Sequence, residues 1–345
     1  FKWIEPHWAY LRGRYPATIV TRFLGALALD WDSCAGELAG PGRPTNPYYQ
    51  MSEVSPLRRR PLLRKDSGFY CYTPLIFEVG LEHCIYDRMR DIDGDAFTTA
   101  FGEVLERYVE DALDDAHLRF VPERQLARFL PGRKVVDFVV IAEDIVVMVE
   151  VKAVEAHIWA QVRPDPETRE RRFTAITKAV TQFVAMAPVL HAGTGDIPGT
   201  SRPNVYGLVI TYKEHYLGPG PGAWTDFLRA GVTRELGASP NTFDPANLLF
   251  TSIQDFEWFL EAVRTEPKRF RDTIVNAAAA NTVPMQQKLA FRQHLDEREV
   301  RAAPLPSRIR APFEEFTSGI QDRLGLGLEP AETWPRGRLP SETVD

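Results

Sequence analysis

The chain has 345 residues, of which 44% are hydrophobic and 26% are charged, and its formal net charge is −6. This composition is that of a folded protein with one large or two ordinary domains, and it excludes disorder of the whole chain. The acidic balance excludes a generally basic coat for nucleic acid, although it leaves room for a local basic groove.

The cysteines and the apolar runs predict a cytoplasmic protein without a membrane segment. Cys34, Cys71 and Cys84 form no close pair and show no zinc-ligand spacing, which suits a reducing compartment. The apolar run Ile19–Leu29 is interrupted by Arg22 and is too short to span a bilayer. It also lacks the organisation of a signal peptide.

Residues 1–95 are predicted to form an accessory region that is helical with loops, including a helix over Leu75–Met89. Within it, Arg58–Arg60 is followed closely by Phe69, Tyr70 and Tyr72. Basic residues beside aromatic ones can follow a phosphate backbone and stack on bases. Given the acidic balance of the chain, we favour the alternative, a solvated face beside ordinary core aromatics.

The next helix is predicted over Thr98–His117, because its apolar residues recur at helical spacing. That stripe is Leu105, Tyr108, Val109, Ala112, Leu113 and Ala116. Glu106 falls at the edge of the stripe, whereas Glu103, Glu110 and Asp114 fall on the solvated side. Short strand-like runs follow at Leu118–Val121 and Gln125–Leu130. Glu123, between them, is interpreted as a loop carboxylate, with a further acid at a site as the alternative.

The stretch Lys134–Ala153 predicts a hairpin of two β-branched strands joined at Glu143-Asp144. Pairing the strands about that turn places Asp137 directly opposite Glu150, on the same face. Like charges opposite each other destabilise a sheet, and burying them costs roughly several kcal/mol unless something compensates.

A divalent cation is the simplest compensator, since Mg²⁺ binds carboxylate oxygens. Lys152 shares the face of Glu150, while the carbonyl of Val151 between them is a possible further oxygen ligand. Two carboxylates beside an ammonium are suited to metal-assisted phosphodiester hydrolysis. The alternative is a partly exposed strand with a Glu–Lys pair and an unrelated Asp.

Beyond the hairpin, a helix is predicted from about Glu170 to Ala187, followed by a buried strand over Asn204–Tyr212. The helix has a buried stripe, and Lys178 and Gln182 share the opposite face. Gly218–Gly222 predicts a break. The segments expected after it are helices over Trp224–Leu228, Asp255–Val263, Arg269–Ala279 and Met285–Leu295, an edge strand over Leu248–Thr251, and a Pro- and Gly-rich tail after about Val300, extended or clamped onto a partner.

Asp137, followed across a hairpin by Glu150-Val151-Lys152, resembles the PD-(D/E)XK nuclease superfamily, whose motif is a lone acid and then Glu/Asp-x-Lys. The family's first acid often follows a proline, whereas Val136 precedes Asp137 here. The resemblance implies an α/β fold with a restriction-endonuclease-like core: a helix, a three-stranded meander, a second helix and a further strand, in a mixed sheet flanked by helices. The expected organisation is an accessory region (1–95), a nuclease core (96–217), a helical C-terminal extension (218–300) and the tail (301–345), with mostly helical extensions.

The same resemblance implies the site residues. Gly102-x-x-x-Glu106 is similar to the first core helix of family members, so Glu106 is expected to assist as a metal ligand or by orienting water; a plain surface glutamate on a charged helix is the alternative. Asp137, Glu150 and the Val151 carbonyl are expected to hold Mg²⁺ or Mn²⁺, and Lys152 to steer the nucleophilic water. On the second helix the residues expected to contact nucleic acid are Lys178, Gln182 and Arg172; two solvent-facing polar side chains at 178 and 182 are the alternative.

The function predicted is therefore a metal-dependent nuclease that cuts DNA, with restriction, repair or anti-phage defence as the setting that the resemblance implies. The long flanking regions favour control by a protein partner or a homo-oligomer. The alternatives are a catalytically inactive family member that binds nucleic acid or scaffolds a complex, and a branch that cuts RNA.

Overall fold

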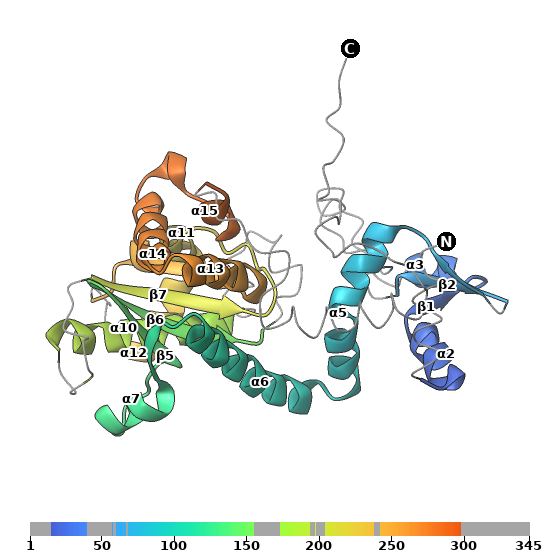
Figure 1. The fold of residues 1–345 in the computed structure, drawn as a ribbon, viewed down its shortest axis with the longest axis horizontal. Helices are drawn as coiled ribbons and strands as arrows, with labels where there is room; N and C mark the ends of the chain where they lie inside the picture. Colours follow the sequence, from blue (N-terminus) through green and yellow to red (C-terminus); the bar gives the residue numbers. More distant parts are fainter. Residues whose placement is uncertain are drawn as a thin grey trace, which may run out of the picture.

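The computed structural model describes residues 15–39, 57, 60–66, 68–154, 173–193, 197, 204–237 and 242–297. These residues form an α/β structure with two sheets, one of three strands and one of five, and helices around them (Figure 1). Arg172 and the tail after residue 297 lie outside the described residues, so the predictions for them stay predictions.

The accessory region contains a small sheet that the sequence did not predict. Its elements are α2 (Ala17–Ala26), β1 (Ala28–Asp30), α3 (Cys34–Ala39), β2 (Leu62–Lys65) and β3 (Gly68–Cys71). β1 pairs with β2 in parallel, and β2 pairs with β3 antiparallel. Strands of three or four residues are too short to display an alternating pattern, so the prediction of helices and loops alone was incomplete.

Two long helices lead from this region into the core. α5 (Pro74–Ile92) begins at Thr73, whose side chain accepts from the amide of Ile76, and α6 (Gly94–Asp115) begins at Asp93, which accepts from Ala96. Both predicted helices are therefore confirmed, with earlier starts. Figure 1 shows the small sheet at the end of α5 that is remote from the larger sheet.

The five-stranded sheet has the order β4-β5-β6-β7-β8. β4, β5 and β6 form an antiparallel meander, and β7 and β8 continue the sheet in parallel with β6. Phe138 pairs with Val149, so the register continues to Asp137 opposite Glu150, as the hairpin predicted. The strands are β4 (Arg119–Pro122), β5 (Phe138–Ala142), β6 (Ile145–Lys152), β7 (Asn204–Thr211) and β8 (Leu248–Ser252).

The strand-like run predicted over Gln125–Leu130 is wrong, because Glu123–Phe129 forms helix α7. Pro122 precedes its first turn, and Leu126 and Leu130, four residues apart, are both buried. That spacing fits one face of a helical turn, and proline is tolerated at the start of a helix.

Helices cover both faces of the larger sheet. One face packs against α10 (Thr174–Ala192) and a continuous helical run of α11, η2 and α12 (Gly220–Leu236), so the predicted break ends before Gly220. The other face packs against α6, α13 (Ile253–Thr265) and α14 (Lys268–Asn281). The order helix, three-stranded meander, helix, strand is thus observed along the chain.

The helix predicted over Met285–Leu295 is also wrong as a single element. The chain forms a short 3-10 turn η4 (Pro284–Gln286) and then α15 (Arg292–Glu297). Between them, the side-chain oxygen of Gln293 accepts from the amides of Leu289 (2.8 Å) and Ala290 (3.2 Å), which replaces the helical hydrogen bonds there. Within the part of the chain that the structure describes, no helix is long and apolar enough to cross a membrane.

Candidate metal and catalytic site

Strand pairing brings three charged residues to one end of the five-stranded sheet. Pro122, at the end of β4, pairs with Phe138, at the start of β5. The next residue outward on each strand is therefore Glu123 and Asp137, and the amide of Glu123 donates to the carbonyl of Asp137 at 2.7 Å. Lys152 is the last residue of β6, which extends to the same end.

Asp137 is held in place by the neighbouring strand. Its Oδ2 accepts a 2.6 Å hydrogen bond from the amide of Val151, and the Lys152 ammonium lies 3.7 Å from the same oxygen. Burial raises the pKa of Asp137, whereas Lys152 and the Val151 amide lower it, and burial outweighs them. A buried carboxylate with a fixed orientation is thus presented just before the start of β5.

Glu150 and Lys152 form a buried ion pair beside Asp137. The side chain of Glu150 is 0% exposed, and its Oε2 contacts the Lys152 ammonium. Burial raises the pKa of Glu150, and Asp137 adds to this. Burial lowers the pKa of Lys152, but the attraction of Glu150 and Asp137 outweighs it and leaves the pKa raised, so Lys152 remains an ammonium.

A second group of carboxylates lies around Asp137. Glu106 from α6, Glu123 from α7 and Asp137 each present an oxygen within 4.8 Å of the others. Burial raises the pKa of Glu106 to about 7, with contributions from Asp137 and Glu123. Burial and Asp137 likewise raise the pKa of Glu123. Three acids are therefore held close together, with Asp137 buried, Glu106 half-buried and Glu123 exposed.

This trio fits a hard divalent cation. Mg²⁺ takes oxygen ligands at about 2.1 Å in octahedral geometry, so two ligands of one ion lie about 3.0 Å apart when adjacent and about 4.2 Å apart when opposite. The three carboxylates each present an oxygen within 4.8 Å of the others, close enough for one ion to gather them. Oxygen-only ligands favour Mg²⁺, Ca²⁺ or Mn²⁺ over softer metals. The site therefore has the chemistry and approximately the size that such an ion requires.

The structure brings together all four residues predicted as catalytic: Glu106, Asp137, Glu150 and Lys152. They form two groups, with Glu106 and Asp137 in the trio and Glu150 paired with Lys152. Glu150 contacts Lys152 and is not one of the trio. Its predicted role as a metal ligand, and that of the Val151 carbonyl, stay predictions. Glu123 takes a place in the trio that the sequence interpretation gave only as an alternative.

Two of the residues predicted to contact nucleic acid lie on α10. Lys178 is exposed. The side-chain amide of Gln182 donates to the carbonyl of Val135 at 2.7 Å, which ties α10 to the segment just before Asp137. Gln182 therefore has a described structural role in supporting the site, whereas Arg172 lies outside the described residues.

Asp137 belongs to the carboxylate trio and also lies beside the Lys152 ammonium. The site therefore places a positive charge next to a possible cation site. Such a site can bind a divalent ion and hold an anionic group against Lys152. Comparisons with protein-family models, with curated proteins and with solved structures find no match to this chain.

Proposed function

We propose that this chain is a metal-dependent nuclease of the PD-(D/E)XK type that hydrolyses phosphodiester bonds. The observation that carries the proposal is the position of Asp137, whose carboxylate is shared between the trio with Glu106 and Glu123 and the ion pair of Glu150 with Lys152. The order helix, meander, helix, strand around these residues supports it.

In this proposal the carboxylate trio binds the cation, and Lys152 beside it acts on the phosphate and the water. Glu106, Glu123 and Asp137 hold the divalent cation, which when bound polarises the phosphate and acidifies a water. Lys152 places a positive charge where negative charge develops on the phosphate oxygens, and it orients the attacking water. Glu150 fixes the Lys152 ammonium, and the Val151 amide fixes Asp137.

DNA is the substrate that we propose, because of the resemblance in the motif, and restriction or anti-phage defence under the control of a partner subunit is the corresponding setting. Exposed Lys178 on α10 is the described candidate for contact with the phosphate backbone. RNA and single-stranded DNA are treated as outcomes of the test below.

The test is a cleavage assay on duplex DNA, single-stranded DNA and RNA, with Mg²⁺, Mn²⁺ or EDTA. We expect cleavage of duplex DNA with either metal and none with EDTA. Asp137→Asn and Lys152→Met should each reduce the rate about a hundredfold or more, because Asp137 holds the cation and Lys152 supplies positive charge to the transition state.

The matched control is Lys268→Met, which removes an exposed lysine at the start of α14 and should leave the rate unchanged. Full activity of Asp137→Asn, or activity that persists in EDTA, would contradict the proposed mechanism. Metal-independent binding of DNA without cleavage by the wild-type chain would instead favour the inactive binding subunit.

A further inference from the structure

The segment between Glu123 and Asp137 is basic, in a chain whose net charge is −6. Residues 124–136 contain no acid, and their cations are Arg124, Arg128, Arg133 and Lys134. The segment covers α7 after its first residue, and then the turn and extended chain that lead to β5. Because a solvated surface ordinarily mixes charges of both signs, an acid-free run beside the carboxylate trio favours an anionic partner.

Three of these cations are available to a ligand. Arg124 is already paired, with Glu110 at 2.6 Å. The other three are exposed, and within the described part of the chain no carboxylate pairs with them: Arg128, Arg133 and Lys134. Their positive charge is therefore not offset by a neighbouring acid.

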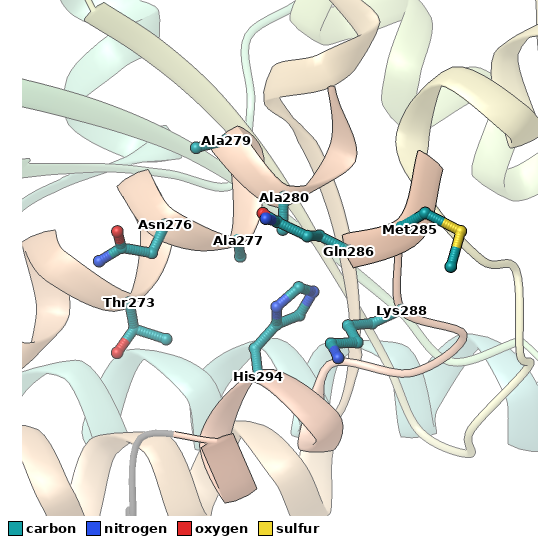
Figure 2. Close-up of a pocket in the computed structure, with 9 residues that line it drawn as sticks. All are labelled: Thr273, Asn276, Ala277, Ala279, Ala280, Met285, Gln286, Lys288 and His294. Carbon is teal, nitrogen blue, oxygen red and sulfur yellow. The ribbon is translucent and has the colours of Figure 1, made fainter. Parts of the chain in front are cut away.

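The cavity of the C-terminal extension differs in this respect. It lies between α14, the η4 turn and α15, and Figure 2 shows that its lining includes Lys288 and His294. Both side chains have interaction partners within the protein. The basic segment, in contrast, presents cations without such partners.

The turn that carries Arg133 and Lys134 is anchored on both sides. The amide of Arg133 donates to the carbonyl of Leu130 at 3.2 Å, and Gly132 has a φ of 77°, which glycine adopts readily. Leu130 before the turn and Val135 after it are both buried. The two cations are therefore held at the surface by an ordered turn.

This turn lies beside the carboxylate trio. Lys134 is three residues before Asp137, and three residues of extended chain span roughly 11 Å at most. Each strand of a DNA duplex carries a phosphate about every 3.4 Å of the helix axis. A strand with one phosphate at the trio therefore has other phosphates within reach of Lys134 and Arg133.

Helix α10 adds a fourth unpaired cation to the same surface. Gln182 donates to the carbonyl of Val135 at 2.7 Å, so α10 contacts the chain immediately after Lys134. Lys178 lies one helical turn before Gln182, at the spacing that puts two side chains on one face. Lys178 is exposed and, among the described residues, pairs with no carboxylate.

We propose that the unpaired cations of α7, the following turn and α10 bind the phosphate backbone of duplex DNA. These cations are Arg128, Arg133, Lys134 and Lys178. Contacts to phosphate oxygens carry no sequence information, so the surface holds duplexes of any sequence against the carboxylate trio. The inference rests on the proposed function for the identity of its ligand, and it assigns to the turn before β5 a role in binding that substrate.

The test is fluorescence anisotropy of a labelled DNA duplex with the full chain in EDTA, where the proposed nuclease does not cut. The double variant Arg133→Gln/Lys134→Gln should weaken binding about tenfold or more at low salt, equally for two duplexes of unrelated sequence. Each phosphate contact contributes about 0.9 to the slope of log affinity against log salt concentration, so the double variant should lower that slope by about 1.8 between about 50 mM and 200 mM salt. Lys178→Gln should lower it by about 0.9.

The matched control is Arg88→Gln/Lys268→Gln, which removes one exposed arginine on α5 and one exposed lysine on α14 and should bind as the wild type does. Three results would overturn the proposal: no duplex binding by the wild type, an unchanged slope in Arg133→Gln/Lys134→Gln, or tighter binding of polyglutamate than of the duplex. The last result would assign the surface to an acidic protein partner.

Cleavage with Mg²⁺ distinguishes failure of this inference from failure of the proposed function. We expect Arg133→Gln/Lys134→Gln to raise KM and leave kcat unchanged, because the lost contacts hold substrate and transition state equally. Absence of cleavage by a wild type whose binding depends on Arg133 and Lys134 would refute the nuclease and support the surface. Cleavage by the wild type with KM unchanged in the double variant would support the nuclease and refute the surface.

Discussion

At the scale of single residues, Glu150 shows why the charges of this site depend on one another. Its carboxylate has no exposed surface, and the described group that offsets its charge is the Lys152 ammonium. Removing one partner of a buried ion pair leaves the other charge uncompensated in a poorly solvated place. Burial raises the pKa of Glu150 to about 8, so the carboxyl is largely ionised only above that pH. We therefore expect Lys152→Met to lower the free energy of unfolding by about 3–5 kcal/mol in urea titrations at pH 9.

A double variant separates this electrostatic effect from loss of packing. Glu150→Gln combined with Lys152→Met removes both charges and should recover much of the lost stability, since a pair is less costly to replace than to break. Lys268→Met should change the stability by no more than about 0.5 kcal/mol. Equal stability of the single and the double variant would show that the charge of Glu150 is not what Lys152 offsets.

His215 is a second buried titratable group, and it predicts a loss of stability in acid. Its Nε2 lies 3.0 Å from the carbonyl of Val154, which can only accept, so Nε2 carries the proton. Burial lowers the pKa of His215 from 6.5 to about 4, helped by Lys213 and opposed by the Val154 carbonyl. The unfolded chain therefore binds a proton at His215 that the folded chain does not, and stability falls as pH drops from about 6.5 towards 4.

The expected loss at His215 approaches 1.4 kcal/mol per pH unit in that range, because each unit of pKa difference corresponds to about that free energy. The measurement is the free energy of unfolding between pH 8 and pH 4.5 for the wild type and His215→Gln. The wild-type curve should fall more steeply below pH 6.5. Parallel curves for the two proteins would contradict the prediction.

At the scale of elements, one tyrosine joins α5 to the core. Tyr86 is 4% exposed, and its ring lies 4.9 Å from that of Phe101 on α6 and 4.5 Å from that of Tyr212, just after β7. Lys213 lies over the Tyr86 ring and pairs with Asp87 at 3.1 Å. Through Tyr86, α5 therefore contacts α6, which carries Glu106. It also contacts Tyr212, the residue after β7, whose last residue pairs with Lys152 on β6.

We expect Tyr86→Ala to cost about 3–5 kcal/mol in the free energy of unfolding, because it leaves a cavity among these rings. The neighbouring Ile85 is 71% exposed, so Ile85→Ala provides a control at the adjacent helical position and should cost no more than about 0.5 kcal/mol. Urea titration of both variants is the measurement. A similar cost for the two substitutions would mean that α5 does not dock through Tyr86.

The elements also show which features local sequence can predict. The hairpin of Asp137 and Glu150 was predictable because two β-branched strands about one turn admit a single register that keeps both acids on one face. The position of Glu123 in the trio was not predictable from local sequence. It depends on the pairing of β4 with β5 and on helix α7, which was predicted as a strand. The small sheet of β1, β2 and β3 was missed because β1 and β2 pair across a long separation in the chain.

At the scale of the whole molecule, the carboxylate trio links metal binding to folding. α6, α7 and the start of β5 each contribute one acid, so the three charges meet only when the chain is folded. A cation that binds the folded chain stabilises it by mass action, by about 2.7 kcal/mol when its concentration is a hundred times the dissociation constant. Mg²⁺ should therefore raise the free energy of unfolding of the wild type, and EDTA should reverse the effect.

Glu106→Gln should separate repulsion from metal binding, because the two effects have opposite signs at this residue. In the metal-free chain at pH 8, above the raised pKa of about 7, Glu106 is largely ionised beside Asp137 and Glu123, so the neutral amide should increase stability. The same substitution removes a metal ligand, so it should reduce the stabilisation by Mg²⁺. Glu103→Gln, on the exposed side of α6, should alter neither quantity. Urea titrations of the three proteins with EDTA and with Mg²⁺ give both values, and a Mg²⁺ response in Glu106→Gln as large as that of Glu103→Gln would exclude Glu106 as a ligand.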